Sequence, residues 1–105
     1  MEDTDVKIAN VMDLESLGRS ISPIAKRCNI TGVFLFGSRA RGDFDENSDY
    51  DLVVDVNDDY DIGDHVRFID DVSKALGHDV DVITRRSLND DRFSKDVLRE
   101  MVHVC

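Results

Sequence analysis

The hydrophobic residues of the first third of the chain recur every three or four positions, which is the spacing of one face of a helix. Pro23 falls within this series, and Ser22 followed by Pro23 is typical of an N-cap with a proline in the first helical turn. We therefore predict two short helices, roughly over residues 12–20 and 23–29. The apolar positions that define them are Leu14, Leu17, Ile21, Ile24, Ala25 and Cys28.

Two later stretches have the patterns of β-strands. Thr31 to Phe36 is a continuous, mostly apolar run that stops at Gly37, as expected for a buried strand. Tyr50 to Val56 alternates instead, which predicts a strand with one packed face and one open face. Its packed side carries Tyr50, Leu52, Val54 and Val56, and the other side carries Asp49, Asp51, Val53 and Asp55.

The rest of the chain predicts a helix, a strand and a second helix. An amphipathic helix begins at Ile62 and ends at Gly77, and Asp79 to Thr84 follows as a third strand. Asp90 or Asp91 can cap the last helix, after which residues 102–105 can become extended. The apolar positions of these elements are Ile62, Val66, Ile69, Val72 and Leu76, then Val80 and Val82, and finally Phe93, Val97, Leu98 and Met101.

This order of elements predicts a single α/β (α+β) domain over residues 1–105. We expect a small mixed sheet of three or four strands with helices packed on one face, and the pattern leaves the strand order open. No apolar run reaches the roughly 18 residues of a membrane span. The polar, acidic N-terminus does not resemble a secretory signal, so we expect a cytoplasmic protein.

The charge of the chain narrows its possible partners. There are 13 basic and 23 acidic residues, for a net charge of −10. A nucleic-acid backbone requires a basic face, so we do not expect direct binding to nucleic acid. An acidic surface instead fits a metal site or a basic protein partner.

A turn rich in glycine and arginine follows the first strand and is a candidate phosphate site. Gly37 lets the backbone approach a ligand closely, and a helical turn from Ser38 to Arg41 would present free N–H groups to an anion. Arg39 and Arg41 add positive charge. Taken alone, the same residues would also fit a tight strand-to-helix turn with solvated arginines.

Aspartates supply the second part of the candidate site. Asp49 and Asp51 are two positions apart on a strand, so they share a face, and their mutual repulsion would be relieved by a divalent cation. Asp81, between Val80 and Val82, can reach the same face, with Asp79 as the rival third carboxylate. Three such groups can hold two metal ions about 3.5–4 Å apart, while solvated surface aspartates are the plain alternative.

Together these parts resemble a known signature. Gly37 and Ser38, ten further residues, and then Asp49-x-Asp51 is similar to the motif of the DNA polymerase β-like nucleotidyltransferase superfamily. The surrounding residues, from Leu35 to Gly42 and from Ser48 to Val54, resemble the minimal nucleotidyltransferase (MNT) family. Asp81 stands where that family carries its third carboxylate. The resemblance covers about residues 12–104.

The resemblance implies a nucleotidyltransferase fold and a Mg²⁺-dependent enzyme that uses ATP, with two Mg²⁺ ions expected. Many MNT proteins are antitoxins of a HEPN-domain RNase toxin, and some transfer AMP from ATP to a tyrosine of that toxin. This chain would then be an antitoxin of the type VII kind. The alternatives are a catalytically silent antitoxin that only covers its toxin, and a transferase that acts on a small molecule.

The resemblance also assigns roles to single residues. Asp49 and Asp51 would bind both Mg²⁺ ions, and Asp81 would complete the catalytic metal site and help to deprotonate the attacking hydroxyl. Gly37 and Ser38 would hold the β- and γ-phosphates. Two arginines, Arg39 and Arg41, would neutralise the departing pyrophosphate or contact the partner. Because the chain is short, we expect a partner to supply the acceptor.

Overall fold

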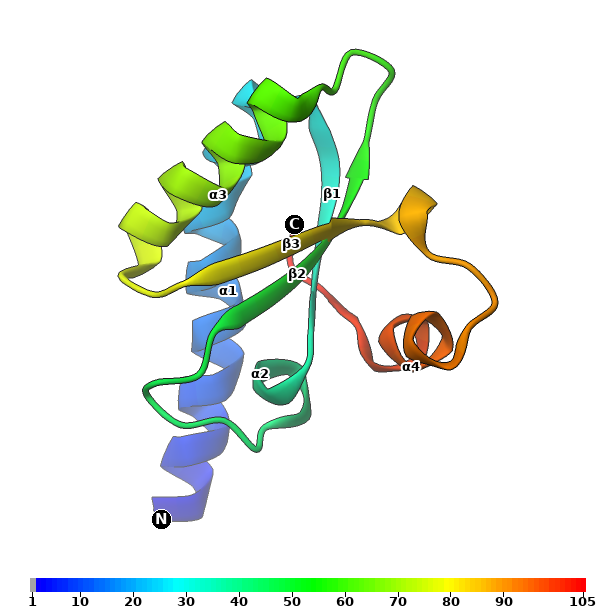
Figure 1. Cartoon of the computed structure of the whole chain (residues 1–105). Helices are drawn as coiled ribbons and strands as arrows, with labels where there is room; N and C mark the ends of the chain where they lie inside the picture. The colour runs from blue at the N-terminus through cyan, green and yellow to red at the C-terminus, as the bar shows by residue number, and fades with distance from the viewer. Residues whose placement is uncertain (1) are drawn as a thin grey trace.

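The computed structural model describes the backbone of residues 2–105 and the side chains from Leu14 onward. The elements are α1 (Glu2–Arg27), β1 (Ile30–Phe36), α2 (Ser38–Arg41), β2 (Tyr50–Val56), α3 (Ile62–Leu76), β3 (Val80–Thr84), the 3-10 turn η1 (Arg85–Ser87), α4 (Arg92–Glu100) and β4 (Val102–His103). Figure 1 shows their arrangement, which confirms the predicted mixed α/β fold. No helix within the described residues has the length and hydropathy needed to cross a membrane.

The four strands form one mixed sheet in the order β3-β2-β1-β4. Strand β1 pairs antiparallel with both β2 and β4, whereas β2 and β3 are parallel. A parallel pair needs a long connection to bring the chain back to the same end of the sheet, and α3 provides it. This topology places β2, with its aspartates, in the interior of the sheet.

Helices α1 and α3 cover one face of the sheet, and α4 packs against part of the other face (Figure 1). On the first face, Phe68 of α3 and Leu52 of β2 are fully buried in the main core. On the second face, Val97 of α4 packs with Phe36 and Val53. The prediction of helices on one face therefore holds for the two long helices, while α4 buries Val53, which the alternating pattern had placed on the open side.

Helix α1 is continuous, so the prediction of two short helices is wrong. Pro23 lies inside the helix and is exposed. An interior proline costs about 3 kcal/mol. Ile21 and Ile24 are buried on the same helix face, and each contributes about 1.5–3 kcal/mol when removed from water. Burial of this face offsets the proline, and a break at Ser22 would turn part of it away from the sheet.

The apolar stripe predicted for α3 is only partly the buried one. The helix has the predicted bounds and ends at Gly77 in the left-handed conformation. Its buried residues are Asp64, Phe68 and Val72, whereas Ile62 is 76% exposed and Val66 is 60% exposed. The buried face of the helix is therefore rotated relative to the predicted one and runs through Asp64, Phe68 and Val72.

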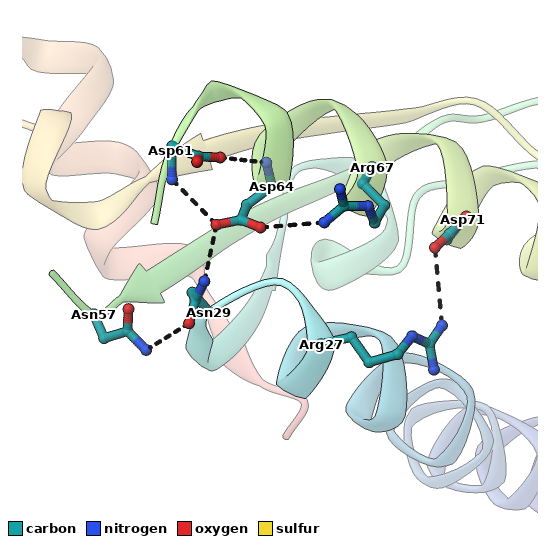
Figure 2. A network of polar contacts seen from close by, with 7 residues as sticks. All are labelled: Arg27, Asn29, Asn57, Asp61, Asp64, Arg67 and Asp71. Carbon is teal, nitrogen blue, oxygen red and sulfur yellow. Dashed lines mark hydrogen bonds and ion pairs between the residues drawn. The ribbon is translucent and has the colours of Figure 1, made fainter. Parts of the chain in front are cut away.

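Asp64 is the centre of a polar network that fixes α3 to the end of α1 (Figure 2). Asn29 has a positive φ of 60° just after α1, and its Nδ2 donates to Asp64 Oδ2 at 3.0 Å. Asn57 Nδ2 donates in turn to Asn29 Oδ1 at 3.2 Å. The N–H of Asp61 also donates to Asp64, and the N–H of Asp64 donates to the Asp61 side chain, forming a capping box. The hydrogen bond from Asn29 is the main reason why the pKa of Asp64 is lowered.

Candidate active site

The sheet register brings Phe36, Asp51 and Asp81 into one row across three strands. Phe36 is paired with Asp51 between β1 and β2, and Asp51 is paired with Asp81 between β2 and β3. Directly paired residues point to the same face of a sheet, so the two carboxylates lie side by side. Asp79 precedes β3, and its main-chain carbonyl accepts from the Tyr50 N–H at 3.0 Å. The register thus makes Asp81, rather than Asp79, the direct neighbour of Asp51.

The surroundings of Asp51 disfavour its negative charge. Partial burial raises the pKa of Asp51 most, and the charges of Asp81 and Asp49 raise it further, while Arg41 lowers it. The closeness of the two side chains adds a smaller hydrogen-bonding contribution from Asp81, which also raises the pKa of Asp51. A divalent cation beside these oxygens would favour the ionised forms, since Mg²⁺ prefers hard oxygen ligands.

Asp49 lies just outside the strands, whereas Asp51 and Asp81 lie on two paired strands. It precedes the first residue of β2 and is exposed, although its charge is close enough to act on Asp51. Among the side chains from Leu14 onward, no group of three His, Cys, Asp or Glu residues is close enough together to hold a metal ion as it stands. Asp51 and Asp81 are direct neighbours across the sheet, and Asp49 would have to turn toward them to complete a ligand set.

Gly37 lies against Asp51 at the end of β1. Its φ of 75° and ψ of −156° belong to a region that essentially only glycine adopts. A Cβ atom at this position would lie 2.4 Å from Asp51 Oδ2. Helix α2 begins at the next residue, Ser38, and the first N–H groups of a helix have no partner within it. The N–H groups of Ala40 and Arg41 donate to the Gly37 carbonyl, so the backbone donors that this turn can offer to a ligand are those of Ser38 and Arg39.

Arg39 faces the loop that leads into β2. Its Nη2 donates to the Ser48 carbonyl at 2.8 Å, and its guanidinium lies 4.0 Å from the centre of the Tyr50 ring and 4.8 Å from that of Phe44. These contacts hold the loop before Asp49 in place. Phosphate binding by Arg39 stays a prediction, and in this geometry it would require the side chain to leave the loop.

Arg41 connects α2 with α4. Its Nη1 donates to Glu100 Oε1 at 3.0 Å, and its Nε lies 3.4 Å from Asp43 Oδ2. The guanidinium is also near enough to lower the pKa of Asp51. The sequence analysis missed Glu100, since a contact between residues 59 positions apart leaves no trace in local spacing.

A cavity of about 410 Å³ lies away from the carboxylate row. Leu17 of α1, Leu35 of β1 and Tyr50 of β2 line it, and these side chains belong to the main core on the α1 side of the sheet. Asp51 and Asp81 point to the opposite face and do not line it. The cavity also touches the turn after Gly37, because Arg39, Ala40, Arg41 and Gly42 help to line it, so it borders the candidate phosphate site without including the two carboxylates.

Comparisons with known proteins identify the family and support the fold. A family model described as a nucleotidyltransferase domain matches residues 19–104. A candidate protein adenylyltransferase of Methanocaldococcus jannaschii is 33% identical over 94 residues, which are 89% of this chain and 99% of the relative. The solved structure of a candidate minimal nucleotidyltransferase is 34% identical with a TM-score of 0.72, over 85% of this chain and 93% of the other.

A more distant solved structure shares the fold. It contains a tri-AMPylated HEPN toxin of Shewanella oneidensis in complex with an MNT antitoxin. The similarity has a TM-score of 0.65 at 19% identity, and it covers 88% of this chain and 71% of the other chain.

Proposed function

The chain belongs to the nucleotidyltransferase domain family, and we propose that it is a Mg²⁺-dependent protein adenylyltransferase that uses ATP. The observation that carries this proposal is the pair of Asp51 and Asp81 beside the Gly37 turn. It combines two neighbouring carboxylates with a backbone that approaches one of them, Asp51, without a Cβ atom. A relative that matches almost the whole chain at 33% identity is named a candidate protein adenylyltransferase, which supports the same activity.

The donor chemistry fits Mg²⁺. Asp51 and Asp81 present hard oxygen ligands whose mutual repulsion a cation would relieve, and Asp49 is free to turn toward them. These three residues would hold Mg²⁺ at the phosphates of ATP. A bound metal ion would neutralise the negative charge that builds up on the phosphate oxygens.

The chain's own residues then have distinct tasks in the transfer. The first backbone N–H groups after Gly37, those of Ser38 and Arg39, and the Ser38 hydroxyl would bind the β- and γ-phosphates, which form the leaving pyrophosphate. An acceptor hydroxyl oxygen attacks the α-phosphorus, and the bond from that phosphorus to the bridging oxygen breaks. Asp81 would accept the hydroxyl proton, while Arg41 offsets negative charge beside Asp51.

We further propose that the acceptor is a tyrosine of a HEPN-domain RNase toxin, which the chain neutralises as an antitoxin. The net charge of −10 is complementary to a basic, RNA-binding partner. A structure with the same fold contains an AMPylated HEPN toxin together with its MNT antitoxin, which makes this class of partner the first to test.

The test is transfer of label from α-labelled ATP, with Mg²⁺, to a HEPN-domain protein encoded beside this chain. Wild-type protein should label the partner, and replacing the accepting tyrosine by phenylalanine should abolish labelling. Asp81→Asn should lose transfer, whereas Asp79→Asn, two residues away on the same strand edge, should keep it. The double variant Asp49→Asn with Asp51→Asn should fail both to transfer and to bind Mg–ATP.

Other outcomes would identify the alternatives. A stable complex that blocks the toxin without any label transfer would sink the enzymatic proposal and leave a binding antitoxin. Labelling of a small molecule instead of the protein would indicate a small-molecule transferase. Equal transfer by the Asp81→Asn and Asp79→Asn variants would contradict the assignment of the third carboxylate.

A further inference from the structure

An exposed aromatic side chain stands beside the carboxylate row. Phe93 is the second residue of α4, and it is 58% exposed although phenylalanine is usually buried. The Phe93 and Phe36 ring centres are 6.3 Å apart, with the rings nearly perpendicular at 80°. This edge-to-face contact holds one part of the Phe93 ring against Phe36 and leaves much of the ring open to solvent.

The sheet register places this ring next to the candidate active site. Phe36 is the direct partner of Asp51 between β1 and β2, so its side chain and the Asp51 carboxylate are neighbours on one face. Phe93 rests on Phe36 from that same face. It is therefore one side chain removed from the carboxylate pair that would position the α-phosphate.

The helix that carries Phe93 is held firmly. Asp91 caps its start by accepting from the Ser94 N–H at 2.7 Å, and Val97, one turn after Phe93, is only 2% exposed in the second core cluster. Glu100 at its other end pairs with Arg41 of α2. Helix α4 is thus anchored at both ends, and it carries the Phe93 ring on the face of the sheet opposite α1 and α3 (Figure 1).

We propose that Phe93 is the stacking platform for the nucleobase of the substrate. This inference rests on the proposed function, because it takes the triphosphate to lie at Gly37, Ser38 and Asp51. The base is joined through the ribose to the α-phosphate. It must therefore lie near the carboxylate row, about the length of a ribose away from the charged oxygens. Among the described residues, Phe93 offers an exposed aromatic face on that side, and bases stack on such faces without needing a particular hydrogen-bond pattern.

The experiment compares two ligands that share the phosphates but differ in the base. Binding of Mg–ATP and of Mg–tripolyphosphate is measured by titration calorimetry for wild type, Phe93→Ala and Leu98→Ala. Leu98 is the matched control, since it lies on the same helix and is 42% exposed. We expect Phe93→Ala to weaken Mg–ATP on the order of tenfold, the loss of one stacked base, and to leave tripolyphosphate binding unchanged. Leu98→Ala should change neither affinity.

A second variant guards against damage to the fold. The chain contains no tryptophan, so Phe93→Trp introduces a single tryptophan, whose emission can be excited apart from that of the two tyrosines, at the proposed platform. Its emission should be quenched by Mg–ATP and not by Mg–tripolyphosphate, and its affinity for Mg–ATP should equal or exceed that of wild type.

The remaining outcomes overturn the inference in distinguishable ways. If wild type binds both ligands and Phe93→Ala binds each of them with the wild-type affinity, Phe93 does not contact the base and the proposed function stands. Equal weakening of both ligands would mean that Phe93 acts only through the phosphate site. If Phe93→Ala weakens the complex with a protein partner but not Mg–ATP, the ring belongs to the partner interface. Failure of wild type to bind either ligand overturns both proposals.

Discussion

Two glycines flank α2, Gly37 before it and Gly42 after it. Replacing Gly37 by alanine should damage the candidate site more than the same change at Gly42. Gly37 has φ 75° and ψ −156°, and an added Cβ would lie 2.4 Å from Asp51 Oδ2. Real Cβ atoms do not approach an oxygen this closely, so either the turn or the Asp51 carboxylate must move. Because Asp51 pairs with Asp81, that movement would break the carboxylate row.

Two contributions set the size of the effect. A non-glycine residue in this backbone region costs about 1–3 kcal/mol. Forcing an extra carbon into a filled position typically costs a further 1–3 kcal/mol or so. We therefore expect Gly37→Ala to lower the free energy of unfolding by about 3 kcal/mol. Small domains have roughly 5–15 kcal/mol of stability, so the variant should still fold and can be tested for binding.

Gly42→Ala provides the control at the other end of α2. Gly42 also has a positive φ of 90°, but an added Cβ there meets no atom within 4 Å. It should cost about 1–2 kcal/mol from backbone strain alone. Urea unfolding followed by circular dichroism gives both stabilities, and calorimetric titration with Mg–ATP gives the affinities. We expect binding to survive in Gly42→Ala and to be lost in Gly37→Ala. Equal stability and equal binding in the two variants would refute the contact between Gly37 and Asp51 as the cause.

Three further changes have defined outcomes. Pro23→Ala should raise the free energy of unfolding by about 1–3 kcal/mol, because the exposed ring is replaced by a residue that can donate the missing helical hydrogen bond, and a loss of stability in urea titration would contradict this account. Asp51→Asn should stabilise the metal-free protein by roughly 1 kcal/mol through relief of like-charge repulsion while abolishing transfer, so a less stable variant in thermal melting without Mg²⁺ would count against the crowded carboxylates. Asp64 has a lowered pKa, so its ionised form stabilises the fold fully above the unfolded-state value of 3.8, and that contribution disappears as the pH falls through the folded-state pKa. Asp64→Asn should therefore be less stable than wild type at pH 7, with the gap narrowing in acid, and a gap that is constant with pH would exclude this linkage.

Local sequence patterns predicted most of the elements because each depends on neighbouring residues. The alternation from Tyr50 to Val56 defined β2, and the apolar run before Gly37 defined β1. Gly77 marked the end of α3 because its left-handed conformation suits glycine. The same reasoning failed for α1, where the local signal of Ser22 and Pro23 was outweighed by a buried face that only packing against the sheet creates.

The candidate site also has a part that the sequence predicted and a part that it left open. The sequence alone identified Gly37, Ser38, Asp49 and Asp51 as a group, since their spacing along a strand, a turn and a second strand is a local property. It left Asp79 and Asp81 as rivals, because both have the same position in the alternation of β3.

The family resemblance favoured Asp81, and the tertiary structure gives the two residues different neighbours. The register between β2 and β3 is set by side chains packed across the sheet and by the α3 crossover, and it pairs Asp51 with Asp81. The same packing placed Phe93 and Glu100, both on α4, beside residues more than fifty positions away. The sequence therefore determined which residues have the chemistry for a site, and the long-range packing decided which of them meet, because contacts across a sheet depend on register rather than on spacing along the chain.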